Sequence, residues 1–204
     1  MLDKVSNKVL CFLTGNNELD EEKREILLFG IKRIIEDIPK TIGLVLIGFI
    51  LNILYEMLIV TVILTLYKTF VGGVHAKTNF MCFISSTVFY LAIIYSAKYI
   101  ITAGITRFFL LSIDYIFATY CIWVYVPADV PEIPKVNKEL RKSTKIKAFI
   151  VLNLIYITTL LIIKDLYIQR LIMYSVFYIN LMTTRTMYKL FKNEYGFEVY
   201  IPEQ

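Results

Sequence analysis

Residues 41–67 read TIGLVLIGFILNILYEMLIVTVILTLY, a nearly unbroken apolar run interrupted only by Asn52 and Glu56. A helix needs about 20 apolar residues to cross a bilayer. The run can therefore form one tilted helix, or two short helices with a turn at Asn52–Glu56. This choice sets the number of membrane crossings, and with it the side of the membrane on which every later segment lies.

The rest of the sequence has the composition of a polytopic membrane protein. It is 57% hydrophobic, and its charged residues, 19% of the chain, gather between the apolar runs instead of alternating with them. The three cysteines show no paired spacing, so neither a disulfide framework nor a zinc site is expected. Four further runs are candidate transmembrane helices: Phe80–Ala97, Phe108–Val126, Ile146–Ile163 and Leu166–Met187.

The basic residues decide between one helix and two. Of the 22 Lys and Arg residues, seven lie in residues 1–40 and six in the loop expected at residues 127–147. Basic segments stay on the cytoplasmic side of a membrane, so an even number of crossings must separate them. Residues 41–67 must then form two helices. The prediction is an all-α membrane protein of about six transmembrane helices, with both termini, residues 68–79 and residues 127–145 in the cytoplasm.

Residues 1–40 are amphipathic. Apolar residues recur there at helical spacing among charged ones, an acidic run at 18–22 favours the start of a second helix, and Pro39 predicts its end. We expect interfacial helices that lie on the bilayer, with ordinary packing on the rest of the protein as the alternative. The predicted division is amphipathic helices in 1–40, a transmembrane domain in 41–190 and a cytoplasmic tail in 191–204.

The candidate chemistry lies between two apolar runs, where the single histidine, His75, precedes Cys82 by seven residues. An imidazole that takes the proton of a thiol makes it a nucleophile at neutral pH. In one straight helix the two would stand about 10 Å apart along the axis, so the chain must break between them. Thr78 or Asn79 can cap a helix that carries Cys82, and Gly72-Gly73 supplies backbone freedom. On spacing alone, an interfacial histidine and an ordinary core cysteine stay an open alternative.

The motif is Gly73-Val-His75-Ala-Lys77 followed by Cys82, with a second glycine at 72. It resembles the accessory gene regulator protein B (AgrB) family, membrane cysteine endopeptidases of Gram-positive quorum-sensing systems. The resemblance extends over essentially the whole chain, including Tyr125-Val-Pro127-Ala-Asp129 before the basic stretch. In the family's pattern a basic residue, usually Arg, precedes the histidine by seven positions. Here Lys68 keeps the charge but lacks the bidentate fork of arginine.

The resemblance implies an endopeptidase that acts on an AgrD-like precursor peptide with an amphipathic leader and an acidic tail. Cys82 would attack the carbonyl before the tail, and His75 would act as base and then as acid. A thiol or hydroxyl of the peptide would then close a ring on the resulting thioester. The resemblance also implies a homodimer in the cell membrane, in contact with lipid. We expect no metal, no cofactor and no nucleic-acid partner.

Four further residues are candidates for substrate binding: Lys68, Gly73, Lys77 and Asn79. For the two lysines, contact with the acidic tail and anchoring at the membrane interface are equally open. Asn79 or Ser85 could orient the imidazole, although no third catalytic residue stands out in the sequence.

Some polar residues and cysteines lie inside or beside the apolar runs. Asp114 is a functional candidate because a carboxylate is costly there; a pair with Arg107 or a polar bond between helices would equally explain it. Glu56 is expected to mark the turn within 41–67. Cys11 and Cys121 are expected to be inert.

Two other classes of function stay open. A multi-pass transporter or exporter of a small peptide, without proteolytic activity, would explain the spans, although two related halves are not visible. A non-enzymatic membrane scaffold would explain the hydrophobicity but not the His75–Cys82 motif. Cys82→Ala distinguishes them, because only a peptidase needs the thiol.

Overall fold

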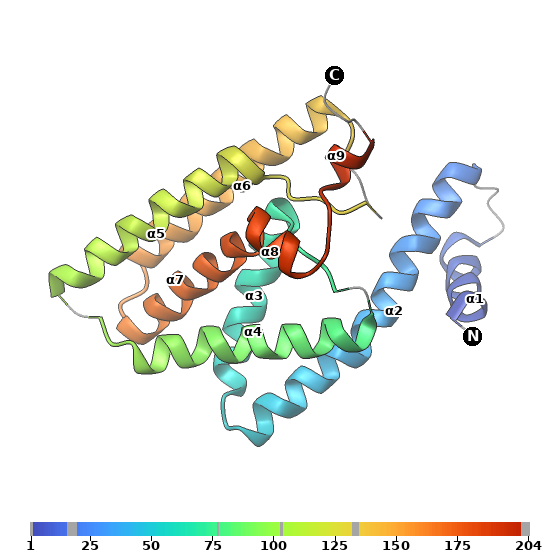
Figure 1. Ribbon diagram of the computed structural model, residues 1–204. Coiled ribbons are helices and arrows are strands. Elements are labelled where there is room, and N and C mark those ends of the chain that lie inside the picture. The colour runs from blue at the N-terminus through green and yellow to red at the C-terminus, as the bar shows by residue number, and fades with distance from the viewer. Residues whose placement is uncertain (1, 16–19, 77, 103, 132–134, 201–204) are drawn as a thin grey trace. The chain divides into compact units, whose positions relative to one another are not determined.

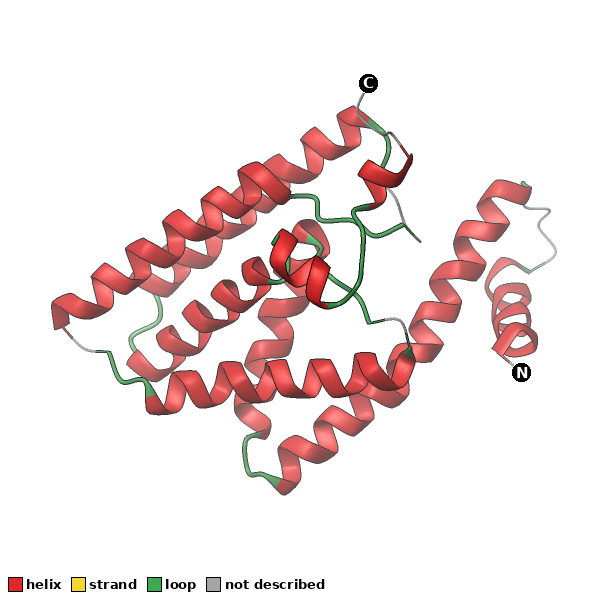
Figure 2. Cartoon of the chain, viewed as in Figure 1, coloured by secondary structure: helices red, strands yellow, loops and turns green. Residues whose placement is uncertain are grey.

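The computed structural model describes residues 2–15, 20–76, 78–102, 104–131 and 135–200. Throughout these segments the regular structure is helical and no strand is formed (Figure 2), which confirms the predicted all-α class. The helices in Figure 1 are α1 (Leu2–Thr14), α2 (Glu21–Ile50), α3 (Leu54–Val71), α4 (Asn79–Tyr99), α5 (Gly104–Tyr125), α6 (Lys138–Leu161), α7 (Leu166–Leu181), α8 (Arg185–Leu190) and α9 (Gly196–Tyr200). Residues 1–54 and 55–204 form two compact units.

The first unit contains α1 and α2, which pack against each other. Two helices were expected in residues 1–40, but the end predicted at Pro39 is wrong, because α2 continues through it. Proline removes one backbone donor from a helix. The turn around it is supported locally, since the Thr41 hydroxyl donates to the Asp37 carbonyl at 2.9 Å and the Lys40 ammonium lies 2.8 Å from the Asp37 carboxylate.

The apolar run of residues 41–67 is divided into two helices, as the charge distribution predicts. Asn52 has a φ of 53°, a left-handed conformation that asparagine tolerates. The amides of Asn52 and Ile53 reach back to the carbonyls of Phe49 and Gly48, at 3.2 and 2.9 Å. These bonds end α2 before Glu56, which lies in the first turn of α3.

Within the described segments, four helices, α3 to α6, are long and apolar enough to cross a membrane. Their outer faces suit lipid: on α3, Leu58, Val62 and Leu66 recur every fourth residue and are each more than half exposed, at 52%, 57% and 58%. The 16-residue α7 spans about 24 Å, less than the roughly 30 Å of the hydrocarbon core. The count of six therefore stays a prediction.

In the second unit α7 is the most enclosed helix, in contact with α4, α5 and α6 (Figure 1). The expected run Leu166–Met187 is not one helix, because the chain leaves α7 after Leu181 and restarts at Arg185. In the turn, the Thr183 hydroxyl donates to the Asn180 carbonyl at 2.7 Å. Met182 lies after the end of α7, and its carbonyl accepts a bond from the segment that carries His75.

The basic stretch of residues 127–147 is only partly a loop, which corrects the sequence prediction. α6 begins at Lys138, and the Asn137 side chain accepts bonds from the amides of Glu139 and Leu140 at 2.8 and 3.2 Å. Lysine and arginine are good helix formers, and a capped start lets them extend the apolar helix by about two turns.

Candidate active site

The segment that carries His75 leaves α3 through Gly72 and Gly73 and lies against two distant parts of the chain. The Gly73 amide donates to the Ala128 carbonyl at 2.8 Å, and the Ala128 amide donates to the Val71 carbonyl at 2.9 Å. The Val74 amide donates to the Met182 carbonyl at 3.2 Å. The backbone directly before His75 is therefore held from both sides.

The two glycines are needed because of this close approach. Gly72 and Gly73 have φ values of 83° and 127°, which L side chains rarely adopt. A Cβ on Gly72 would lie within 2.2 Å of the Ala128 carbonyl oxygen. The backbone freedom expected of the two glycines is thus confirmed, and it is used in a segment that backbone hydrogen bonds hold in place.

Cys82 lies in the first turn of α4, three residues after its start. Thr78 is the N-cap: its hydroxyl accepts from the Met81 amide at 3.2 Å, and its carbonyl accepts from the Cys82 amide at 2.9 Å. The predicted break between His75 and Cys82 is thus confirmed, with Thr78 and not Asn79 as the cap. Both His75 and Cys82 are partly exposed.

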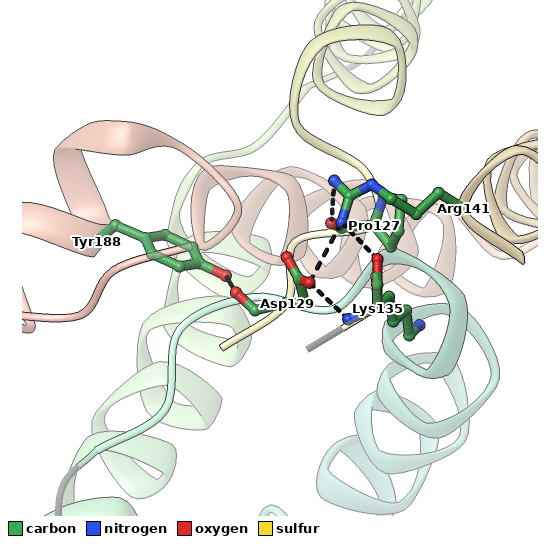
Figure 3. A network of polar contacts seen from close by, with 5 residues as sticks. All are labelled: Pro127, Asp129, Lys135, Arg141 and Tyr188. Atoms are coloured by element: carbon green, nitrogen blue, oxygen red, sulfur yellow. Dashed lines mark hydrogen bonds and ion pairs between the residues drawn. The ribbon is translucent and has the colours of Figure 1, made fainter. Parts of the chain in front are cut away.

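A polar network around Asp129 holds the loop that pairs with the glycines (Figure 3). The Asp129 carboxylate, 1% exposed, accepts from the Lys135 amide at 2.8 Å and from Arg141 at 3.2 Å. Arg141 also donates to the Pro127 carbonyl at 3.4 Å, and the Tyr188 hydroxyl donates to the Asp129 carbonyl at 2.9 Å. Since these bonds join the start of α6 and the end of α8 to one loop, they fix Ala128 between them.

Two buried tyrosines complete this side of the site. The rings of Tyr188 and Tyr195 stack with centroids 3.9 Å apart, and the Tyr195 hydroxyl donates to the Thr183 carbonyl at 2.6 Å. Burial raises the pKa of both phenols above the ordinary value. Both hydroxyls therefore stay protonated at physiological pH and keep donating to the two carbonyls.

The other residues predicted for substrate binding are distributed around this segment. Lys68 lies in the last turn of α3, Gly73 is buried in the pairing just described, and Asn79 is the exposed first residue of α4. Lys77 lies outside the described residues. The Ser85 hydroxyl donates to the Cys82 carbonyl at 3.1 Å, so its observed bond is made within α4 and not to the imidazole.

The polar residues of the apolar helices form bonds between helices. Asp114 of α5 is buried and accepts from the Tyr156 hydroxyl of α6 at 2.5 Å. Arg107 donates instead to Gln169, at 2.8 Å. Of the alternatives for Asp114, the structure therefore shows the bond between helices. Glu56 accepts from Tyr167 at 3.2 Å.

Cys121 is buried in α5 and Cys11 is exposed on α1, and both are free thiols.

Comparison with known proteins decides the family. The family model described as Accessory gene regulator B matches residues 6–187. The chain belongs to the AgrB family. An AgrB-like protein of Clostridium perfringens strain 13 is 25% identical over 191 residues, 94% of this chain and 98% of the relative. Accessory gene regulator protein B of Staphylococcus aureus is 27% identical over 167 residues, 82% of this chain and 85% of the relative. No solved structure matches the chain significantly.

Membership of the AgrB family supports a role in the agr quorum-sensing system, and the four long apolar helices agree with a membrane protein. The sequence prediction missed several residues that contact the site of this AgrB protein, among them Arg141, Met182 and Asn193. Arg141 was interpreted as part of a topology-determining charge run, Met182 as part of an apolar helix and Asn193 as tail. None has a local signal for its role, because each acts on a segment far away in the sequence.

Proposed function

We propose that this AgrB protein is a membrane-embedded cysteine endopeptidase that removes the C-terminal tail of an AgrD-like precursor peptide and promotes ring closure. The observation that carries the proposal is the break at Thr78, which places His75 on a pinned loop and Cys82 in the first turn of a separate helix.

In the proposed reaction, the Cys82 thiol gives its proton to the His75 imidazole and the thiolate attacks the carbonyl carbon that precedes the tail. The tetrahedral intermediate collapses, the C–N bond breaks, and the imidazolium returns its proton to the leaving amine. The core peptide is then a thioester on Cys82. A thiol or hydroxyl of the core peptide gives its proton to the now neutral His75 imidazole and attacks this thioester, which closes a lactone or thiolactone. The Cys82 thiolate leaves and takes the proton back from the imidazolium.

Ring closure competes with hydrolysis of the thioester. Exchange of a thioester for a thiolactone is nearly isoenergetic, whereas hydrolysis is downhill, so exclusion of water at the membrane surface favours the cyclic product.

The proposal is tested with purified protein in liposomes and a synthetic precursor whose internal nucleophile has been replaced by alanine. Because this peptide cannot close the ring, we expect the acylated enzyme to accumulate. Mass spectrometry should detect the core peptide on the fragment that contains Cys82, and hydroxylamine should release it. Recovery of only intact precursor, with no modified enzyme, would contradict the proposed peptidase.

We further propose that the chain crosses the cell membrane several times with both termini in the cytoplasm. Single cysteines are introduced at the exposed positions Glu139 and Lys164, after replacement of the three native cysteines. In intact cells a membrane-impermeant maleimide should label Lys164→Cys, whereas Glu139→Cys should require permeabilised cells, because α6 separates the two positions. The opposite labelling pattern would refute this orientation.

We also propose that the protein functions as a homodimer in contact with lipid. Short spans such as α7 are mismatched to a bilayer, and oligomerisation is one way to relieve the mismatch. After correction for bound detergent, light scattering of the solubilised protein should give twice the 23.8 kDa chain mass. An active species of 23.8 kDa would exclude a required dimer.

A further inference from the structure

The chain from the second half of α8 to the start of α9 folds back onto the segment that carries His75. We call residues 188–197 the strap; the match to the AgrB family model ends at residue 187, just before it. Within the strap, the Asn193 side-chain amide donates to the backbone carbonyl of His75 at 2.6 Å. This bond joins the strap directly to the proposed catalytic base.

A tight turn presents Asn193 to His75. Lys192 has a φ of 53°, and the backbone amide of Asn193 donates to the Tyr188 carbonyl at 2.9 Å. Because this bond ties the Asn193 backbone to α8, the position of the Asn193 side chain is defined.

The strap is held at both ends. Tyr188 donates to the Asp129 carbonyl at 2.9 Å, and Tyr195 donates to the Thr183 carbonyl at 2.6 Å. The guanidinium of Arg141 lies 4.2 Å from the centre of the Phe197 ring, a cation–π contact. The Asp129 loop and the turn after α7, which bond to the backbone before His75, therefore also hold the strap.

The contacts described so far hold the loop before His75, after His75 and at His75 itself. Backbone bonds at Gly73 and Val74 hold the residues before His75, and the Thr78 cap fixes the start of α4 after it. Asn193 supplies a bond to His75 itself. A displacement of about 1 Å between reacting groups can lower a rate about a hundredfold. We therefore expect loss of the Asn193–His75 bond to lower the rate of the chemical step more than the affinity for the peptide.

We propose that Asn193 is a positioning residue that sets His75 relative to Cys82 and does not bind the peptide. This inference rests on the proposed function, because it takes His75 as the base that activates Cys82. It adds to that function a defined role for the strap.

The test uses Asn193→Leu, which keeps the approximate size of the side chain and removes the donor, in a background of Cys11→Ser and Cys121→Ala. We expect kcat for precursor processing to fall about 10- to 100-fold with KM changed less than about twofold. The rate at which iodoacetamide alkylates Cys82 at pH 7 should fall in parallel. Asn193→Gln, which retains the amide, should recover part of both rates.

Glu194→Gln is the matched control, because Glu194 is the exposed neighbour in the same turn; it should leave both rates unchanged. A rise in KM alone would overturn the proposal in favour of peptide binding. Unchanged kcat and an unchanged alkylation rate in Asn193→Leu would overturn the proposal. It would also be overturned if both rates fell only to the extent that a lowered unfolding temperature explains.

Alkylation separates this proposal from the proposed function, since it needs no peptide. If wild-type protein does not process the precursor but Cys82 alkylation still depends on both His75 and Asn193, the positioning role stands and the peptidase assignment fails. If wild-type protein processes the precursor and Asn193→Leu changes neither kcat nor the alkylation rate, the peptidase assignment stands and the positioning role fails.

Discussion

We expect His75→Ala and Cys82→Ala each to lower precursor processing by about a thousandfold or more. The sequence contains no second histidine, so no other imidazole can serve as the base near neutral pH. Alanine at residue 75 keeps the backbone carbonyl that Asn193 contacts, and the variant therefore removes the ring without removing that bond. General-base catalysis alone contributes about 10²–10⁴-fold, and loss of the nucleophile removes the covalent route altogether.

The measurement is cleavage of the precursor in liposomes, followed by mass spectrometry. Cys82→Ser should retain the fold and lose most activity, because a hydroxyl at its ordinary pKa is a much weaker nucleophile than a thiolate. Cys11→Ser and Cys121→Ala are the matched controls and should process the peptide at close to the wild-type rate. Processing by either His75→Ala or Cys82→Ala at wild-type rates would rule out the thiol mechanism.

The second large effect is expected for Gly72→Ala. A Cβ at this position would lie 2.2 Å from the Ala128 carbonyl oxygen, and the φ of 83° is unfavourable for alanine. Left-handed strain and overpacking together cost about 2–5 kcal/mol. The contact is with backbone and cannot be relieved by a side-chain rotation, so the loop must separate from Ala128 and move His75. We expect a lower unfolding temperature in detergent and loss of processing.

Gly104→Ala separates the two causes. Gly104 also has a positive φ, 57°, but a Cβ there would meet nothing within 4 Å. This variant should show the strain of the left-handed conformation alone, about 1 kcal/mol, and near-normal processing. Equal destabilisation by the two substitutions would show that the approach of Gly72 to Ala128 is not important.

The sequence contains the information for those features that are local along the chain. The division of residues 41–67 follows from hydrophobic length and charge placement, and Asn52 is the residue that makes the turn. The break before α4 follows from capping chemistry, because Thr78 satisfies an amide three residues later. The His75–Cys82 pair and the resemblance that it carries are likewise present in a single short segment.

Local patterns gave three element boundaries wrongly, and at one of the three a tertiary bond takes the place of a helical one. Pro39 does not end α2, since neighbouring side chains support the turn around it. The basic stretch enters α6 at Lys138 because Asn137 caps it there. The apolar run after Leu166 stops at Leu181, and the Met182 carbonyl bonds instead to Val74.

Fold class, the two-helix division of residues 41–67 and the identity of the His75–Cys82 motif are determined by the sequence alone, because hydrophobic length, charge and capping act within a few residues. The environment of that motif is decided only by the tertiary structure. Gly72 pairs with Ala128, and Asn193 bonds to His75 across 118 positions. No spacing rule connects such distant residues; they meet because α7 packs among α4, α5 and α6 and brings the turns at the helix ends together.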